Sequence, residues 1–131
     1  MIEPRKVADV MTPNPVSISE TASLAEAAAL LGSKEISGLP VVDASGSLVG
    51  VLSQTDLIKA QANPELSANW RGLPVGEIMT KPALTIPSTA GLDEAARLMG
   101  ERRVHRLVVT DAAATPIGII SASDLVRSWL R

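Results

Sequence analysis

Asp124 and two nearby serines have the residue types and the spacing to bind a small polar ligand. Asp124 follows an apolar run that ends at Ile120, and a carboxylate there can accept two hydrogen bonds from adjacent hydroxyl groups, worth about 1.5–3 kcal/mol. Ser121 and Ser123 lie where a helix is expected to begin, so their hydroxyls and the free N–H groups of that turn favour an anion such as phosphate. The alternative is that Ser121 and Asp124 only cap the helix, as in many proteins.

His105 and Arg106 place cations before the apolar run that precedes this helix. Side chains alternate along a strand, so Arg106 is expected on the side opposite the apolar residues that follow it. If that side faces a ligand, Arg106 can pair with phosphate through its planar guanidinium, and protonated His105 can donate to phosphate. The other cations nearby are interpreted as a solvated helix end: Arg97, Arg102 and Arg103.

A second, weaker set of these residue types lies in the first half of the chain. Ser53, Thr55 and Asp56 repeat the hydroxyl and carboxylate pattern, but Ser37-Gly38 stands where the later set has His105-Arg106. Such a site could bind a ligand without strong phosphate contacts, take those contacts from the other chain of a dimer, or stay empty. The two sites are therefore expected to be unequal.

The distribution of charge along the chain also predicts that the two sites are unequal. The chain has 131 residues and a formal net charge of -2. Residues 1 to 65 carry four basic and eight acidic side chains, whereas residues 66 to 131 carry eight basic and six acidic ones. An anionic ligand should therefore prefer the second half.

Composition excludes several classes of function. The chain has no cysteine and one histidine, which excludes disulfides, thiolate nucleophiles and any metal site that needs two imidazoles. Aromatic residues make up 2% of the chain, too few for a surface that stacks nucleic-acid bases. No apolar run approaches the roughly 20 residues of a membrane-spanning helix, and the N-terminus lacks the apolar stretch of a secretory signal, so a cytoplasmic protein is expected.

An internal repeat organises the whole chain. Displacing the sequence by 68 residues aligns 7–57 with 75–125 without a gap, and 20 of the 51 pairs are identical. The matched pairs include Met11/Met79, Thr12/Thr80, Gly50/Gly118, Ser53/Ser121 and Asp56/Asp124. Two copies are too few for a solenoid, so each half is expected to bury a face against the other.

Each copy is predicted to fold as β-α-β-β-α, which gives an α/β (α+β) fold. Apolar residues at helical spacing begin at Leu24 and Leu92, and Gly32 and Gly100 are expected to close those helices or weaken their last turn. The remaining elements follow from short β-rich runs and from serines that can begin a helix: strands at 16–18, 39–42 and 48–52 with a helix from 53, and strands at 84–86, 107–110 and 117–120 with a helix from 121.

Three segments are predicted along the chain. The first repeat spans 1–60 and the second spans 75–131. A linker with Pro64, Gly72 and no strong periodicity spans 61–74, with some helix expected at its start. Trp70 is expected to hold this linker against the core.

These residues resemble the cystathionine β-synthase (CBS) domain, a family that occurs in tandem pairs. The resemblance covers nearly the whole chain, and its motifs occur twice in register. They are Asp9-Val10-Met11-Thr12 and Glu77-Ile78-Met79-Thr80, Leu39-Pro40-Val41-Val42-Asp43, and the closing segments Gly50 to Asp56 and Gly118 to Asp124. The stretch His105 to Val109, with the second closing segment, is similar to the γ regulatory subunit of AMP-activated protein kinase.

The resemblance implies two clefts between the repeats, each able to hold an adenine ligand such as AMP, ADP, ATP or S-adenosylmethionine. Asp124 and Asp56 would then hold ribose hydroxyls, and Arg106 disfavours S-adenosylmethionine in the second cleft only. Such pairs sense and regulate, for example in energy sensing, and do not catalyse; no cofactor or metal is expected. They commonly form homodimers in which the ligand changes the behaviour of a partner enzyme, channel or transporter.

For the adenine base, the family's pattern implies one group of residues in each repeat. These are Thr12, Pro15 and Val16 with Pro40 in the first repeat, and Thr80, Ala83 and Leu84 with Val108 in the second. Ordinary core packing is the favoured interpretation for Val16 and Leu84, and core or interface packing for Met11 and Met79.

Two other classes of function stay open. The clefts could be vestigial in a structural module that only dimerises, and Trp129 on an exposed helix face would suit such a contact. An enzyme could use His105 as a base with a serine, but no nucleophile motif accompanies that histidine.

Overall fold

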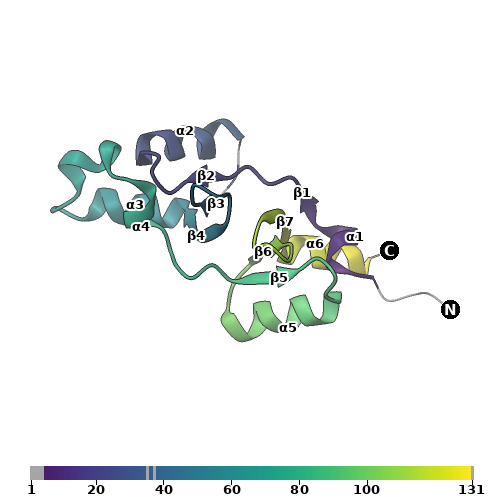
Figure 1. Cartoon of the computed structure of the whole chain (residues 1–131). Helices are drawn as coiled ribbons and strands as arrows, with labels where there is room; N and C mark the ends of the chain where they lie inside the picture. Colours follow the sequence, from purple (N-terminus) through teal and green to yellow (C-terminus); the bar gives the residue numbers. More distant parts are fainter. Residues whose placement is uncertain (1–4, 35, 37, 131) are drawn as a thin grey trace. The chain divides into compact units, whose positions relative to one another are not determined.

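The computed structural model describes residues 5–34, 36 and 38–130. Helices and strands follow the order that the periodicity predicts, with short extra elements at the start of each repeat and in the segment 61–74 (Figure 1). In chain order they are α1 (Val7–Val10), β1 (Thr12–Pro13), β2 (Ile18–Ser19), α2 (Leu24–Lys34), β3 (Gly38–Val42), β4 (Leu48–Ser53), α3 (Gln54–Ala62), the 3₁₀ helix η1 (Ser67–Gly72), α4 (Val75–Ile78), β5 (Thr85–Pro87), α5 (Leu92–Arg102), β6 (Arg106–Thr110), β7 (Pro116–Ser121) and α6 (Ala122–Trp129).

The chain divides into two compact units that do not coincide with the sequence repeats. Unit 1 consists of Met1–Pro15 with Leu84–Arg131, and unit 2 consists of Val16–Ala83. We call residues 7–15 and 75–83, which precede the first strand of each repeat, the lead-in segments. Each unit therefore combines the body of one repeat with the lead-in segment of the other.

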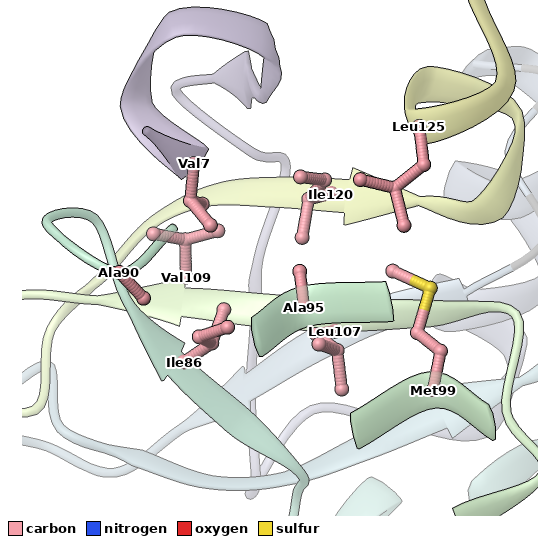
Figure 2. Packing of buried hydrophobic residues seen from close by; sticks show 9 residues of the cluster. All are labelled: Val7, Ile86, Ala90, Ala95, Met99, Leu107, Val109, Ile120 and Leu125. Atoms are coloured by element: carbon pink, nitrogen blue, oxygen red, sulfur yellow. The ribbon is translucent and has the colours of Figure 1, made fainter. Parts of the chain in front are cut away.

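Unit 1 contains a four-stranded sheet in the order β1-β7-β6-β5. The β6–β7 hairpin is antiparallel, β5 runs parallel to β6, and β1 pairs with the far edge of β7. One face of the sheet carries a buried apolar cluster that α1, α5 and α6 complete (Figure 2). Its members are Val7, Ile86, Ala90, Ala95, Met99, Leu107, Val109, Ile120 and Leu125.

Unit 2 repeats this plan with the sheet β2-β3-β4. Its lead-in segment reaches the edge of β4 through a single bridge, in which Val51 and Thr80 exchange backbone hydrogen bonds of 3.0 and 2.9 Å. Its buried cluster is Ile18, Leu24, Ala27, Leu31, Leu39, Val41, Leu52, Ala60 and Val75. Trp70 packs against this cluster, as predicted.

A glycine in the last strand of each unit lets the lead-in segment approach closely. A Cβ on Gly50 would lie 2.7 Å from the sulfur of Met79 and 2.8 Å from the carbonyl oxygen of Thr80. A Cβ on Gly118 would collide with the sulfur of Met11 and lie 3.1 Å from the carbonyl oxygen of Thr12. Met11 and Met79 pack against the two cores, as expected.

Two details of the helices differ from the sequence expectation. Helices α2 and α5 continue past Gly32 and Gly100, and α5 ends where Arg103 adopts a left-handed conformation with φ 54°. A glycine inside an exposed helix costs only about 1 kcal/mol relative to alanine, so the flanking turns carry the helix through it. Within the segment 61–74, where the sequence indicates some helix only at the start, the chain also forms η1 near the end.

Candidate functional site

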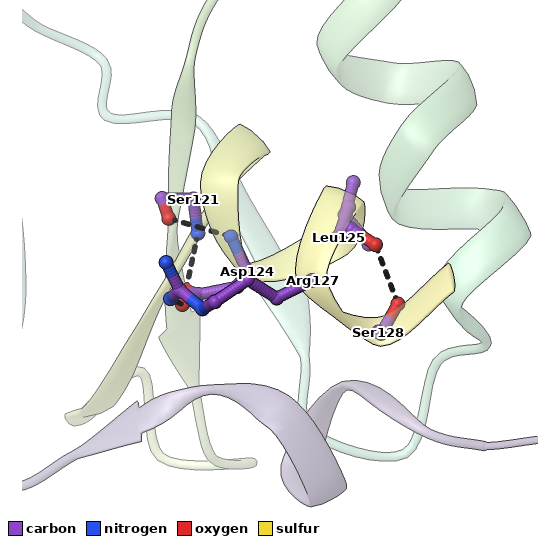
Figure 3. Close-up of polar contacts among 5 residues, drawn as sticks. All are labelled: Ser121, Asp124, Leu125, Arg127 and Ser128. Carbon is purple, nitrogen blue, oxygen red and sulfur yellow. Dashed lines mark hydrogen bonds and ion pairs between the residues drawn. The ribbon is translucent and has the colours of Figure 1, made fainter. Parts of the chain in front are cut away.

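The start of α6 is fixed by a reciprocal pair of hydrogen bonds between Ser121 and Asp124. The backbone N–H of Ser121 donates to Asp124 Oδ2 at 2.8 Å, and the backbone N–H of Asp124 donates to Ser121 Oγ at 3.1 Å (Figure 3). This is the capping arrangement, and it satisfies backbone donors that have no partner within the helix. Ser121 and Asp124 therefore cap α6. This arrangement holds the Asp124 carboxylate in one orientation and leaves lone pairs on both of its oxygens.

Arg127 occupies one of those lone pairs. Its Nη2 lies 2.5 Å from Asp124 Oδ1, one helical turn along α6 (Figure 3). The Asp124 side chain is 9% exposed, whereas the Arg127 side chain is 61% exposed. The carboxylate is thus buried and fixed, and it anchors a cation that solvent can still reach.

Asp124 and Arg127 line a pocket of about 250 Å³ in unit 1. The other lining residues come from α1, β1 and the end of α6: Asp9, Val10, Thr12 and Ser128. Thr12 reaches this place because β1 pairs with β7, with Thr12 opposite Ile119. The pocket therefore joins the lead-in segment of the first repeat to the last helix of the second.

Arg106 lies on the same face of the unit 1 sheet as Ser121. The two residues are direct partners across the antiparallel β6–β7 pair, and directly opposite side chains point to one face. Leu107 and Ile120, the next pair, belong to the core on the other face. The alternation predicted for Arg106 is confirmed, and its side chain is exposed.

His105 contributes its backbone to the start of α6. Its carbonyl oxygen accepts a hydrogen bond of 2.7 Å from the N–H of Ala122, while its side chain is exposed, as is that of Ser123. Since the N–H of Asp124 is bound by Ser121, two first-turn donors expected to be free for an anion already have acceptors. Any anion here depends mainly on side chains.

Unit 2 contains the matching arrangement with one different partner. Ser53 and Asp56 form the same reciprocal pair at 2.9 and 3.2 Å. Here the hydroxyl of Thr80 donates to both Asp56 oxygens, at 3.1 Å to Oδ1 and 3.3 Å to Oδ2. Thr55 is exposed in the first turn of α3, and Ser37 lies outside the described residues.

A second pocket, of about 190 Å³, lies beside Asp56. Its lining residues come from α3, from the connection between α3 and η1, and from α4. They are Asp56, Lys59, Ala60, Asn63, Leu66, Glu77 and Ile78. Under the displacement of 68 residues, five of these match five of the six lining residues of the unit 1 pocket. The two pockets are therefore equivalent sites of the duplicated sequence.

The sequence predicts one group of residues in each repeat for the adenine base. Each group contains residues of both structural units. Thr12 and Pro15 belong to unit 1, whereas Val16 and Pro40 belong to unit 2; Thr80 and Ala83 belong to unit 2, whereas Leu84 and Val108 belong to unit 1. Val16 and Leu84 pack against the two cores, which confirms the packing interpretation for both. Pro40 and Val108 are buried, and Pro15 and Ala83 are half-buried.

Sequence reasoning did not identify Arg127, Lys59, Asp9 or Glu77 as lining residues. A signal for Arg127 was present, since it follows Asp124 by three positions and such pairs meet on a helix surface. Asp9 and Glu77 carry no comparable signal, because their place beside the carboxylates depends on which repeat each lead-in segment joins.

No helix among residues 5–34, 36 and 38–130 is long and apolar enough to cross a membrane.

The family model for the CBS domain matches the chain twice, at residues 7–63 and 75–131.

Curated relatives match nearly all of the chain. It is 37% identical over 127 residues to a homoserine O-acetyltransferase of Methanocorpusculum labreanum, covering 97% of this chain and 25% of that protein. It is 32% identical over 151 residues to the chloroplastic CBS domain-containing protein CBSX2 of Arabidopsis thaliana, covering 95% of this chain and 63% of that one. The chain thus spans between a quarter and two thirds of these relatives.

Two solved structures share the fold along their whole length. CBSX2 in complex with AMP has a TM-score of 0.84 at 37% identity, with 95% of this chain and 96% of that chain covered. The CBS domain pair of protein MJ0100, in complex with 5′-methylthioadenosine and S-adenosyl-L-methionine, has a TM-score of 0.85 at 28% identity, with 97% of each chain covered.

Proposed function

Because the chain belongs to the CBS domain family, we propose that it is a regulatory module that binds adenine nucleotides and signals to a separate partner. The observation that carries the proposal is the convergence in unit 1. Thr12 and Asp124 line one pocket, Ser121 fixes Asp124, and Arg106 lies opposite Ser121 on one face of the sheet.

The chemistry of a nucleotide fits this arrangement. A fixed carboxylate with free lone pairs can accept hydrogen bonds from the two adjacent hydroxyls of ribose, as Asp124 would here. The exposed side chains of His105, Arg106 and Ser123, with Ser121, would hold phosphate beside it. The assignment of Thr80, Ala83, Leu84 and Val108 to the base, made by repeat, stays a prediction.

The pocket of unit 2 is proposed as a second, weaker nucleotide site. Asp56 would hold the ribose with Ser53 and Thr55 beside it, and the assignment of Thr12, Pro15, Val16 and Pro40 to the base stays a prediction. The Gly38 position there offers no cation where unit 1 has Arg106. AMP, ADP and ATP should therefore prefer Asp124 to Asp56.

The relatives support adenine ligands as a class. CBSX2 was solved with AMP, and the MJ0100 pair with 5′-methylthioadenosine and S-adenosyl-L-methionine. The proposal assigns this chain no reaction, since the acetyltransferase it resembles is a longer protein of which it covers 25%. Energy sensing in the cytoplasm and the similarity of the second repeat to the kinase γ subunit stay predictions.

Isothermal titration calorimetry of nucleotide-stripped protein with AMP, ADP, ATP and S-adenosylmethionine tests the proposal. We expect micromolar affinity, about -8 kcal/mol, for at least one phosphate-bearing ligand, and its loss in Asp124→Ala. Asp111→Ala, a carboxylate in a turn away from the pocket, is the matched control. A folded protein that gives no heat with any ligand would contradict nucleotide binding and favour a non-binding structural module.

We also propose that the chain forms a homodimer through its last helices. The exposed large apolar side chains occupy α3, α6 and the residue that follows α6: Ile58 at 65%, Val126 at 51%, Trp129 at 65% and Leu130 at 82% exposure. Three of them, Val126, Trp129 and Leu130, lie on α6 or directly after it, so the α6 of a second copy can cover them in a symmetric contact. Light scattering should give twice the chain mass for the parent chain and a monomer for the double variant Val126→Glu, Trp129→Ser. A monomeric parent chain would contradict the proposal.

That the chain regulates a separate enzyme or transporter stays a prediction.

A further inference from the structure

The pockets of the two units differ mainly in their cations. Both contain two carboxylates at equivalent positions, Asp9 and Asp124 in unit 1 against Glu77 and Asp56 in unit 2. The equivalent cations are Arg127 in unit 1 and Lys59 in unit 2. A ligand that fits both pockets by shape would therefore meet different charge chemistry in each.

Arg127 is held over its pocket, whereas Lys59 is not. Arg127 Nη2 lies 2.5 Å from Asp124 Oδ1, and a guanidinium has five N–H donors, so four remain for other acceptors. In the described part of the chain Lys59 makes no ion pair, and Asp56 is bound instead by the hydroxyl of Thr80. Only unit 1 presents a fixed cation.

A second arginine adds to the charge of the unit 1 pocket. Arg5 Nη1 donates to the carbonyl oxygen of Ser128, a lining residue, at 3.3 Å. The position equivalent to Arg5 in the other repeat is Leu73. Unit 1 thus has a second guanidinium beside a lining residue of its pocket, whereas unit 2 has an apolar residue at the equivalent position.

From this difference we infer that Arg127 is a specificity-determining residue of the unit 1 pocket, in addition to Arg106, and selects adenosine ligands that carry phosphate. The equivalent pocket of unit 2, with Lys59, selects less strongly for phosphate and accepts adenosine derivatives without it more readily. A guanidinium binds phosphate through two parallel hydrogen bonds. Because Asp124 already holds Arg127 in place, little side-chain freedom is lost when phosphate binds. The inference rests on the proposed function and adds to it the ligand class of each pocket.

The test compares two ligands that share adenosine and differ in charge, AMP and 5′-methylthioadenosine. Both are titrated into the full chain and into Arg127→Gln, with Lys59→Gln as the matched control and circular dichroism to verify folding. We expect Arg127→Gln to weaken AMP binding tenfold or more, the loss of a charge-assisted contact. We expect 5′-methylthioadenosine affinity to change by less than about threefold, and Lys59→Gln to weaken AMP binding much less than Arg127→Gln does. Arg127→Lys should recover part of the AMP affinity.

Three results would overturn the inference in distinguishable ways. If both ligands weaken by the same factor in Arg127→Gln, Arg127 only orients Asp124 and does not select phosphate. If neither ligand weakens, Arg127 takes no part in binding. If neither ligand binds the parent chain, the proposed function itself fails, whereas AMP affinity unaltered in Asp124→Asn would show that the unit 1 pocket is not the site. Added salt should weaken AMP more in the parent chain than in Arg127→Gln.

Discussion

The hydroxyl of Thr80 donates to the carboxylate of Asp56, at 3.1 Å to Oδ1, although the two residues belong to different sequence repeats. Thr80 is in the lead-in segment of the second repeat, and Asp56 is in the first turn of α3, which closes the first. The contact shows at the level of single atoms how each unit is built from parts of both repeats.

Removing this hydroxyl should destabilise the protein. Thr80→Val keeps the shape of the side chain and deletes the donor, so we expect a loss of about 0.5–1.5 kcal/mol in the free energy of unfolding, measured in urea. Thr12→Val is the matched control. In the described residues the Thr12 hydroxyl makes no bond to Asp124, whose Oδ1 is bound by Arg127. Equal losses in the two variants would contradict the role of the Thr80–Asp56 contact.

The elements of each repeat were predictable from sequence, because they depend on local patterns. The spacing of apolar residues after Leu24 and Leu92 predicts α2 and α5, and Ser53 and Ser121 indicate the starts of α3 and α6. The capping role of Asp124 followed from the spacing of Ser121 and Asp124 alone.

The assignment of each lead-in segment to a unit was not predictable in this way. The lead-in segments share Met-Thr at Met11-Thr12 and Met79-Thr80, and both partner strands offer a glycine, at Gly50 and Gly118. The local pattern therefore fits either pairing equally well. Only the tertiary structure decides between them, and with it which threonine accompanies which aspartate.

The two glycines give a prediction about packing. Gly50→Ala should destabilise the protein by about 1–3 kcal/mol, because its Cβ would lie 2.8 Å from the backbone oxygen of Thr80, which cannot move without disturbing the bridge to Val51. Gly118→Ala should cost less, since its closest neighbour is the flexible side chain of Met11 and the Thr12 oxygen is 3.1 Å away. Thermal unfolding of both variants measures the difference.

A second substitution separates the causes. Met11→Ala should recover stability in the Gly118→Ala background more than Met79→Ala does in the Gly50→Ala background, where the backbone contact remains. The reverse order would contradict the close approach of the Thr80 carbonyl oxygen.

The turns after β3 and β6 give a prediction about backbone conformation. Ala114 has φ 63°, in the left-handed region, at the position where the first repeat has Gly46 with φ 86°. This conformation costs a non-glycine residue about 1–2 kcal/mol, and glycine gives back about 0.5–1 kcal/mol in chain entropy. Ala114→Gly should therefore stabilise the protein by about 0.5–1 kcal/mol in urea unfolding. Gly46→Ala should destabilise it, and stabilisation by that control would contradict the strain at this position.

The turn at Asp43 gives a prediction about pH. The hydroxyl of Ser45 donates to Asp43 Oδ1 at 2.7 Å, and the N–H groups of Ser47 and Ser45 donate to the same oxygen at 3.1 and 2.9 Å. The Ser45 hydroxyl first, and then these backbone donors, lower the pKa of Asp43 below its ordinary value. The folded state therefore favours the ionised carboxylate more than the unfolded chain does. This contribution to stability is complete above the unfolded pKa of about 3.9 and is lost as the pH falls through the lower folded pKa.

Asp43→Asn removes the titrating group and should flatten this part of the pH dependence. We would measure urea unfolding between about pH 2.5 and 6. As the solution becomes more acidic, the free energy of unfolding of the parent chain should fall toward that of Asp43→Asn. Ser45→Ala, which deletes the leading donor, should raise the pKa of Asp43 toward its ordinary value when the carboxyl carbon is followed by NMR. An Asp43 pKa that does not move in Ser45→Ala would show that the hydroxyl is not the main cause. A parent chain and Asp43→Asn that lose stability in parallel would show that this turn does not contribute to acid sensitivity.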